Sequence, residues 1–176
     1  AHPNTIVPLD SGNALICFRH IDLVAIVDRD SGAFAWQRHE PDWGGPHDVQ
    51  VLENGNMMIF ANRRGRMPAG SKVVEFDQAS GETRWEYQAN PSHTFDSHFI
   101  SGAQRLWNGT TLICEGLWGR IFEITEEGNL VWEYISPHTF KQLPPGPSVG
   151  DVRFVFRAYR YQADGPEIAG RLGAAG

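Results

Sequence analysis

Histidines recur at one place of a repeated pattern in this sequence. The chain has seven histidines, and five of them lie before the pattern starts or in the segments between its copies: His2, His47, His93, His98 and His138. A neutral imidazole can attack an electrophile, move a proton near neutral pH or bind a metal ion. If the segments between copies meet at one axis, these side chains predict a common site.

Two kinds of chemistry fit convergent imidazoles. They can bind Zn, Cu or Fe, or they can act as nucleophile and general acid or base around a small anionic or phenolic substrate. His47 and His98 each lie at the entrance of a predicted strand, and the alternative for every histidine is simple tolerance in a polar loop. Arg105 lies late in such a strand, and its forked guanidinium suits a sulfate or phosphate group.

A hairpin motif recurs three times and must position these residues. Residues 9–17, 52–60 and 106–114 each show an apolar strand end, a turn with glycine at its fourth place and a second apolar strand. Gly12, Gly55 and Gly109 mark these turns. An Asn-Gly pair between apolar runs predicts a two-residue hairpin in which both turn residues have positive φ.

A second motif follows each hairpin. It consists of glycine, three residues and tryptophan, it ends at Trp36, Trp85 and Trp132, and an apolar strand precedes it. In the middle copy the strands are expected at about 47–52, 56–61, 72–77 and 83–87. Four short strands per repeat, recurring at 43 and 54 residues, are typical of propeller blades. We expect the three tryptophans at equivalent last-strand positions, packed between or beside blades.

The fold class expected is therefore all-β, a β-propeller with about three four-stranded antiparallel blades. The alternative is a β-sandwich built of hairpins, but a sandwich has no reason to repeat both motifs. The blades should cover about 1–38, 47–89 and 98–136, within residues 1–137. Residues 138–176 should hold a Pro/Gly-rich loop, a possible strand of a further blade and a tail. Since propellers use four to eight blades, we expect the C-terminal part of a larger propeller, which needs its missing blades or associates with itself.

The hydrophobic content and net charge of the chain indicate which kinds of partner it can bind. The chain has 176 residues, 41% of them hydrophobic, and a formal net charge of -6. This favours a globular protein that binds neither nucleic acid nor a membrane. Cys17 and Cys114 lie at equivalent places with a blade between them, so we expect two buried thiols rather than a disulfide, with a metal or redox pair as the alternative.

Several segments resemble the bacterial arylsulfotransferase-like (ASST) propeller family. They are Pro46 to Gln50 with the hairpin at 52–56, the strand at 71–76, residues 101–106, and the run from Glu123 to Tyr134. The resemblance spans roughly residues 40–161, and His-Asp followed by a Leu-x-x-Gly-Asn hairpin is its more specific part.

The resemblance implies a six-bladed propeller with its active site at the central channel. It also implies sulfuryl transfer from a phenolic sulfate ester to a phenol through a covalent His intermediate, with no nucleotide-type donor, no other cofactor and no metal. It matches His47 to the histidine that contacts the sulfuryl group. His98 and His138 remain the candidates for the nucleophile, with His93 and Arg105 as substrate-binding residues. It implies a periplasmic or secreted location. The alternatives are a non-catalytic binding propeller and a His-ligated metal enzyme.

Overall fold

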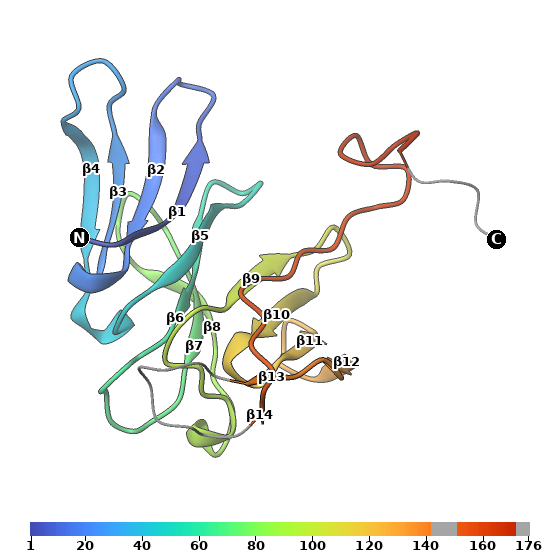
Figure 1. The fold of residues 1–176 in the computed structure, drawn as a ribbon. Coiled ribbons are helices and arrows are strands. Elements are labelled where there is room, and N and C mark those ends of the chain that lie inside the picture. Colours follow the sequence, from blue (N-terminus) through green and yellow to red (C-terminus); the bar gives the residue numbers. More distant parts are fainter. Residues whose placement is uncertain (142–150, 172–176) are drawn as a thin grey trace.

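Short antiparallel strands form most of the regular secondary structure (Figure 1). The computed structural model describes residues 1–141 and 151–171. In those ranges there are three four-stranded sheets, and the order of strands in each sheet equals their order in the chain. The helical elements of the described ranges are short 3₁₀ turns, none of them long and apolar enough to span a membrane. The predicted all-β class with three antiparallel blades is confirmed.

The three sheets are here called blades 1, 2 and 3. Blade 1 consists of β1 (Pro3–Pro8), β2 (Ala14–Phe18), β3 (Leu23–Val27) and β4 (Phe34–His39). Blade 2 consists of β5 (His47–Val51), β6 (Met57–Ala61), β7 (Lys72–Phe76) and β8 (Thr83–Tyr87). Blade 3 consists of β9 (Gly102–Arg105), β10 (Thr111–Glu115), β11 (Arg120–Ile124) and β12 (Leu130–Ile135). A two-stranded sheet of β13 (Phe140–Lys141) and β14 (Asp151–Val152) follows, and the 3₁₀ turns are η1 (Arg19–Ile21), η2 (Pro41–Trp43), η3 (Ser92–Thr94) and η4 (Gly116–Trp118).

The first hairpin of every blade closes in the same way. The amide of Gly55 donates to Leu52 O at 2.9 Å, and the amide of Leu52 donates to Asn56 O at 2.8 Å, with equivalent bonds in blades 1 and 3. Gly55 has a φ of 83°, whereas Asn54 is not among the residues with positive φ. The expectation of two residues with positive φ was therefore wrong. The turn is a three-residue loop in which a type I turn is followed by a left-handed glycine.

The tryptophan motif also has one geometry. Trp36, Trp85 and Trp132 each lie opposite the residue of the third strand that precedes a register shift. A shift at the same place in every blade bends the fourth strand in the same way. The predicted equivalence of the three last-strand positions is confirmed.

Two of these tryptophans join neighbouring blades. Trp36 Nε1 donates to Gln78 O of blade 2 at 3.1 Å, and Trp85 Nε1 donates to Glu126 O of blade 3 at 2.8 Å. Both acceptors lie in the turn between the third and fourth strands of the next blade. Trp132 is 42% exposed and donates no such bond to the described residues. Trp36 and Trp85 therefore pack between blades, as predicted, whereas Trp132 does not.

The hydrophobic core lies between successive blades. Blades 1 and 2 bury one cluster, which includes Leu15, Val24, Met57, Ile59 and Phe76. Blades 2 and 3 bury a second cluster, which includes Phe60, Val73, Phe95, Ile113 and Phe122. Phe95 comes from the connection between blades and packs edge-on against both Phe60 and Phe122. Burying each of these large side chains stabilises the fold by roughly 1.5–3 kcal/mol.

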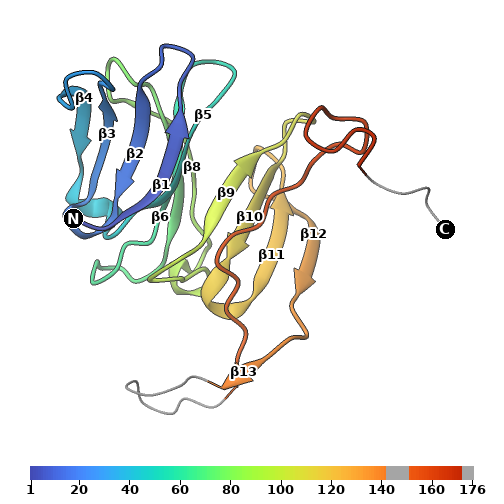
Figure 2. The ribbon, with the colours of Figure 1, turned by 45° about the horizontal axis from the view of Figure 1, so that its top comes forward.

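The segment after β14 runs alongside β9 (Figure 2). Cys17 Sγ in blade 1 donates to Pro46 O, just before β5, at 3.2 Å, and Cys114 Sγ in blade 3 donates to Val155 O at 3.6 Å. Val155 thus stands beside blade 3 as Pro46 stands beside blade 1. Both thiols are buried and free, as predicted, and burial raises the pKa of Cys114 to about 12. Residues 153–161 are not paired as a strand, so a further blade remains a prediction.

Candidate functional site

His47 begins β5 at the end of blade 2 where the chain crosses from blade 1. Its side chain is buried, with only 2% of the residue exposed. Nδ1 lies 3.0 Å from Gly45 O and 2.6 Å from Asn62 Oδ1. A carbonyl oxygen only accepts, so Nδ1 carries the proton and Nε2 carries the lone pair. Burial lowers the pKa of His47 to about 4, which keeps the imidazole neutral at pH 7.

Asn62 connects His47 to the segment that carries His98. Its Nδ2 donates to Ser97 O at 2.5 Å and to Ile100 O at 2.9 Å. Because both partners are carbonyls, the amide oxygen must face His47, which agrees with the tautomer assigned above. Two predicted histidines are therefore joined through one buried asparagine.

The backbone beside His98 is held in an unusual conformation. Ile100 and Ser101 have φ values of 53° and 86°, in the region where a β-branched residue is an outlier. Each such residue costs on the order of 1–3 kcal/mol. Hydrogen bonds offset that cost: Ser101 Oγ donates to Ser97 Oγ at 2.8 Å, and the amide of Leu117 donates to Ser97 Oγ at 3.0 Å. The loop is thereby fixed against η4.

His98 is exposed and lines a pocket of about 540 Å³ between this loop, η4 and the segment after β14. The pocket walls are largely apolar, and the charged residues among them are Asp96, Asp151 and Arg153. Phe99 and Phe154 meet edge to face with centroids 5.1 Å apart, and Trp118, 60% exposed, donates its Nε1 proton to Asp96 O at 2.8 Å. Arg153 also lines this pocket, and its side chain forms no ion pair with the described residues. We call this the aromatic pocket.

The other two predicted histidines lie apart from the pocket. His93 is exposed within η3, and His138 is exposed after β12, where its amide donates to Ser136 Oγ at 3.3 Å. No hydrogen bond or ring contact joins any two of His47, His93, His98 and His138 in the described ranges. Their predicted roles as nucleophile or substrate ligand remain predictions.

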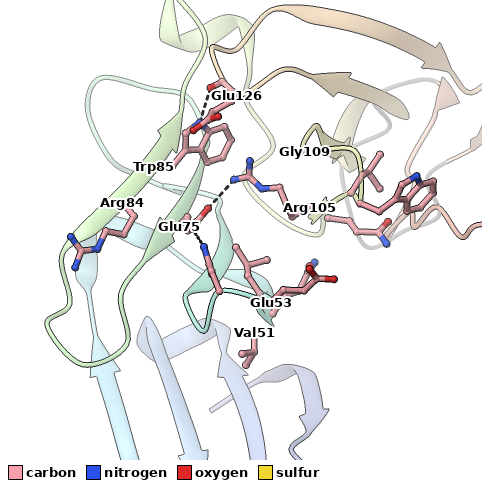
Figure 3. A pocket seen from close by; sticks show the side chains of 14 residues that line it. Val51, Glu53, Glu75, Arg84, Trp85, Arg105, Gly109 and Glu126 are labelled. Atoms are coloured by element: carbon pink, nitrogen blue, oxygen red, sulfur yellow. Dashed lines mark hydrogen bonds and ion pairs between the residues drawn. The ribbon is translucent and has the colours of Figure 1, made fainter.

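Arg105 lies at the other end of its blade. His47 and His98 are near the starts of β5 and β9, whereas Arg105 ends β9, beside the hairpin turns. Its Nη2 bonds Glu75 Oε2 at 2.9 Å, and its guanidinium lies 4.6 Å from the centre of the Trp85 ring (Figure 3). The structure thus does not bring Arg105 to the histidines. Its predicted substrate-binding role would concern a different pocket.

A buried polar cluster surrounds the carboxylate of Asp48, and the repeat does not predict it. Asp48, 1% exposed, accepts hydrogen bonds from the amide of Ala103 at 3.1 Å and from the Tyr159 hydroxyl, and it pairs with Arg157 at 3.3 Å. Arg157 Nη2 also donates to Asn4 O of blade 1 at 3.0 Å. Asp48 therefore ties blades 1, 2 and 3 to the segment after β14. Burial raises the pKa of Asp48, and the Arg157 charge acts in the opposite direction.

The sequence offered only one signal for this cluster, the position of Asp48 next to His47. The contribution of Arg157 and Tyr159 depends on how the last segment folds back over 100 residues later. For a metal site, no group of three or more His, Cys, Asp or Glu residues lies close enough together to hold an ion within the described part of the chain.

The sequence model of one protein family, described as Arylsulfotransferase (ASST), matches residues 1–137 of the chain. This is more than three quarters of the 176 residues. No match was found among curated proteins.

Solved structures resemble this fold at low sequence identity. A protein of unknown function from Bacteroides caccae is 19% identical, with a TM-score of 0.58 over 74% of this chain and 48% of its own. A streptogramin B lyase is 18% identical, with a TM-score of 0.55 over 77% of this chain and 41% of its own. A virginiamycin B lyase from Staphylococcus aureus is 18% identical, with a TM-score of 0.53 over 78% of this chain and 42% of its own. The chain thus spans less than half the length of these structures, and the likeness concerns the fold.

Proposed function

We propose that this chain, which belongs to the arylsulfotransferase (ASST) family, carries the site of a propeller that transfers a sulfuryl group from a phenolic sulfate ester to a phenol. The observation that carries the proposal is the position of His98. Unlike the buried His47, it is exposed, and it lines a pocket with aromatic walls. A phenolic substrate and an imidazole nucleophile can meet there.

The lining of the aromatic pocket suits an aryl sulfate ester in two ways. Phe99, Phe154 and Trp118 offer ring faces and edges for the aryl group, which favours stacked or edge-to-face contact. Arg153 offers a guanidinium without a carboxylate partner among the described residues, and a sulfuryl group carries oxygens that such a fork can bind. The side chains of Asp96 and Asp151 also line the pocket, so the proposal requires Arg153 to hold the sulfuryl group.

The proposed reaction has two displacements. In the first, an imidazole nitrogen of His98 attacks sulfur, the bond between sulfur and the phenolic oxygen breaks, and phenolate leaves. In the second, a phenol oxygen attacks the sulfur of the N-sulfated histidine, the N–S bond breaks and the phenol proton passes to solvent or a base. Positive charge beside the sulfuryl oxygens stabilises both transition states.

In this proposal His47 is a positioning residue. Its Nδ1–H orients Asn62, and Asn62 in turn holds the carbonyls of Ser97 and Ile100 on either side of His98. Direct contact of its Nε2 with the sulfuryl group, as the family resemblance implies, is a further proposal. A periplasmic or secreted location is also a proposal, and so is completion of the site by further blades or a second copy.

The alternative is a propeller that binds an aromatic anion without turning it over, which the same pocket would support. A rapid-mixing experiment with 4-nitrophenyl sulfate separates the two. The proposal expects a burst of 4-nitrophenolate in proportion to protein, followed by turnover once phenol is added. His98→Ala should abolish the burst, and the matched control His39→Ala, an exposed histidine on β4, should keep it.

His47→Gln should slow the burst without abolishing it, and rescue by added imidazole is expected for the His98 variant alone. A full burst in His98→Ala would remove this residue from the reaction. Saturable binding of 4-nitrophenyl sulfate without any burst in the wild-type chain would favour the binding propeller.

A further inference from the structure

A second pocket lies at the opposite end of the blades, between the hairpin turns of blades 2 and 3. It has a volume of about 680 Å³, within the range of small-molecule sites. Its lining comes from the ends of β5 and β9, the turns that follow them, β7 and β8, and the turn between β11 and β12, which carries Glu126 (Figure 3). We call it the turn pocket. None of the five predicted histidines lines it, so it is independent of the proposed transferase site.

One wall of the turn pocket is preorganised. Glu75 accepts hydrogen bonds from Asn54 at 3.0 Å and Asn56 at 2.7 Å, and it holds Arg105 at 2.9 Å. The Arg105 guanidinium in turn lies 4.6 Å from the centre of the Trp85 ring. This wall shows that the local environment accepts a flat cation stacked on an indole and paired with a carboxylate.

The pocket retains negative charge after its internal pairs are counted. Arg105 is paired with Glu75, and Arg84 is paired with Glu82 at 3.2 Å and Asp77 at 3.5 Å. The two other carboxylates of the lining, those of Glu53 and Glu126, form no ion pair or hydrogen bond with the described residues. In the view of Figure 3, Glu126 lies beside Trp85, and Glu53 lies on the far side of Arg105.

Trp107 adds a second aromatic face. It occupies the turn position at which the other two hairpins carry acidic residues, Asp10 and Glu53. It is 55% exposed, and its indole makes no hydrogen bond or ring contact with the described residues. Trp107 belongs to neither of the two hydrophobic clusters between the blades. Its free face borders the turn pocket instead.

We propose that the turn pocket binds an organic cation, a ligand that carries an amidinium or guanidinium group on a flat apolar body. The planar cation pairs with the carboxylate of Glu53 or Glu126, and the apolar body lies against Trp107. A guanidinium or amidinium group donates two parallel hydrogen bonds to one carboxylate, which an ammonium group does not. A neutral ligand of the same shape would leave both carboxylates without a partner.

Titration calorimetry of the full chain with benzamidine, and with benzamide as its neutral counterpart, tests the proposal. Benzamidine should bind saturably and more weakly as salt is raised, because part of the attraction is between charges at an open site. Benzamide should bind at least about tenfold more weakly, which is one decade of affinity.

The variants separate the contributions of the lining. Glu53→Gln and Glu126→Gln together should weaken benzamidine binding about tenfold or more, and Trp107→Ala should weaken benzamidine and benzamide alike. Glu127→Gln is the matched control, because Glu127 lies next to Glu126 but does not line the turn pocket.

These substitutions are at exposed positions, so the variants should fold as the wild type does. Equal affinity for benzamide and benzamidine, unchanged affinity in the double variant, or no saturable benzamidine binding would each overturn the proposal. Loss of sulfuryl transfer in the His98 variant would leave it unaffected.

Discussion

Replacing each motif tryptophan in turn tests how the blades are held together. The three residues are equivalent in sequence and in strand position, but only Trp36 and Trp85 donate an indole hydrogen bond to the next blade. Substitution by Phe keeps most of the apolar ring and removes the N–H donor. A partly buried hydrogen bond between neutral groups contributes about 1 kcal/mol to the free energy of unfolding. We therefore expect Trp36→Phe, which removes a partly buried bond, to lower that free energy by about 1 kcal/mol, and Trp85→Phe, which removes an exposed one, to lower it by about 0.5 kcal/mol.

Substitution by Ala adds the loss of packing. Trp85 is half-buried and lies under the Arg105 guanidinium at 4.6 Å, a contact that contributes roughly 0.5–1 kcal/mol. Together with the hydrogen bond and the lost apolar contact, Trp85→Ala should cost about 3 kcal/mol. Trp132 is 42% exposed, so Trp132→Ala should cost about 1 kcal/mol and Trp132→Phe a few tenths.

Urea denaturation followed by far-ultraviolet dichroism measures these differences, with chain concentration held constant. The decisive quantity is the difference between the losses in unfolding free energy at Trp36 and Trp85 and the loss at Trp132. Equal losses for the three Phe variants would show that the indole bonds do not stabilise the blade contacts. A loss above about 2 kcal/mol for Trp132→Ala would show that another surface covers β12 in solution.

Three further predictions address stability and association. His47 has a pKa of about 4 in the folded chain against an ordinary 6.5, so the unfolded chain binds more protons between these two pH values. The free energy of unfolding should therefore fall by about 3 kcal/mol as the pH drops from 7 to 4. Acid titration of the His47→Gln variant should show a smaller fall than that of the wild type. A methyl group at Gly102 would collide with the Asp48 carboxylate, so Gly102→Ala should lower the free energy of unfolding by about 1–3 kcal/mol, and an unchanged melting curve would contradict the packing described. Val131 and Ile135 of β12 are 54% and 49% exposed, so the chain should self-associate in light scattering and Val131→Lys with Ile135→Lys should reduce the association; a concentration-independent monomer in the wild type would refute this.

Local patterns determined the blades. Each hairpin needs a glycine that tolerates positive φ, each strand alternates or runs apolar, and each last strand carries a tryptophan four residues after a glycine. These are requirements of neighbouring residues, so they are visible in the sequence, and the strands β5 and β8 begin where the repeat predicts them. The turn type was the exception: the position of the glycine was right, but the hydrogen bonds select a three-residue loop.

Local sequence patterns predicted only part of the candidate site, and tertiary packing decided the rest. That His47 begins β5 followed from the repeat, whereas His98, predicted at the entrance of the next first strand, lies in the loop before β9, which begins at Gly102. Asn62 links the His98 loop to His47, and burial keeps His47 neutral; both depend on packing between separate segments. The pocket beside His98 needs Phe154, which lies 56 residues further along the chain. Arg105 shows most clearly that closeness in sequence does not predict closeness in the folded chain. Its sequence distance from His98 is short, yet a strand rises about 3.3 Å per residue and carries it to the opposite end of the blade. Asp48 meets Arg157 and Tyr159 only because the chain returns to the centre after three blades, and no local pattern encodes which distant charge a buried carboxylate will meet.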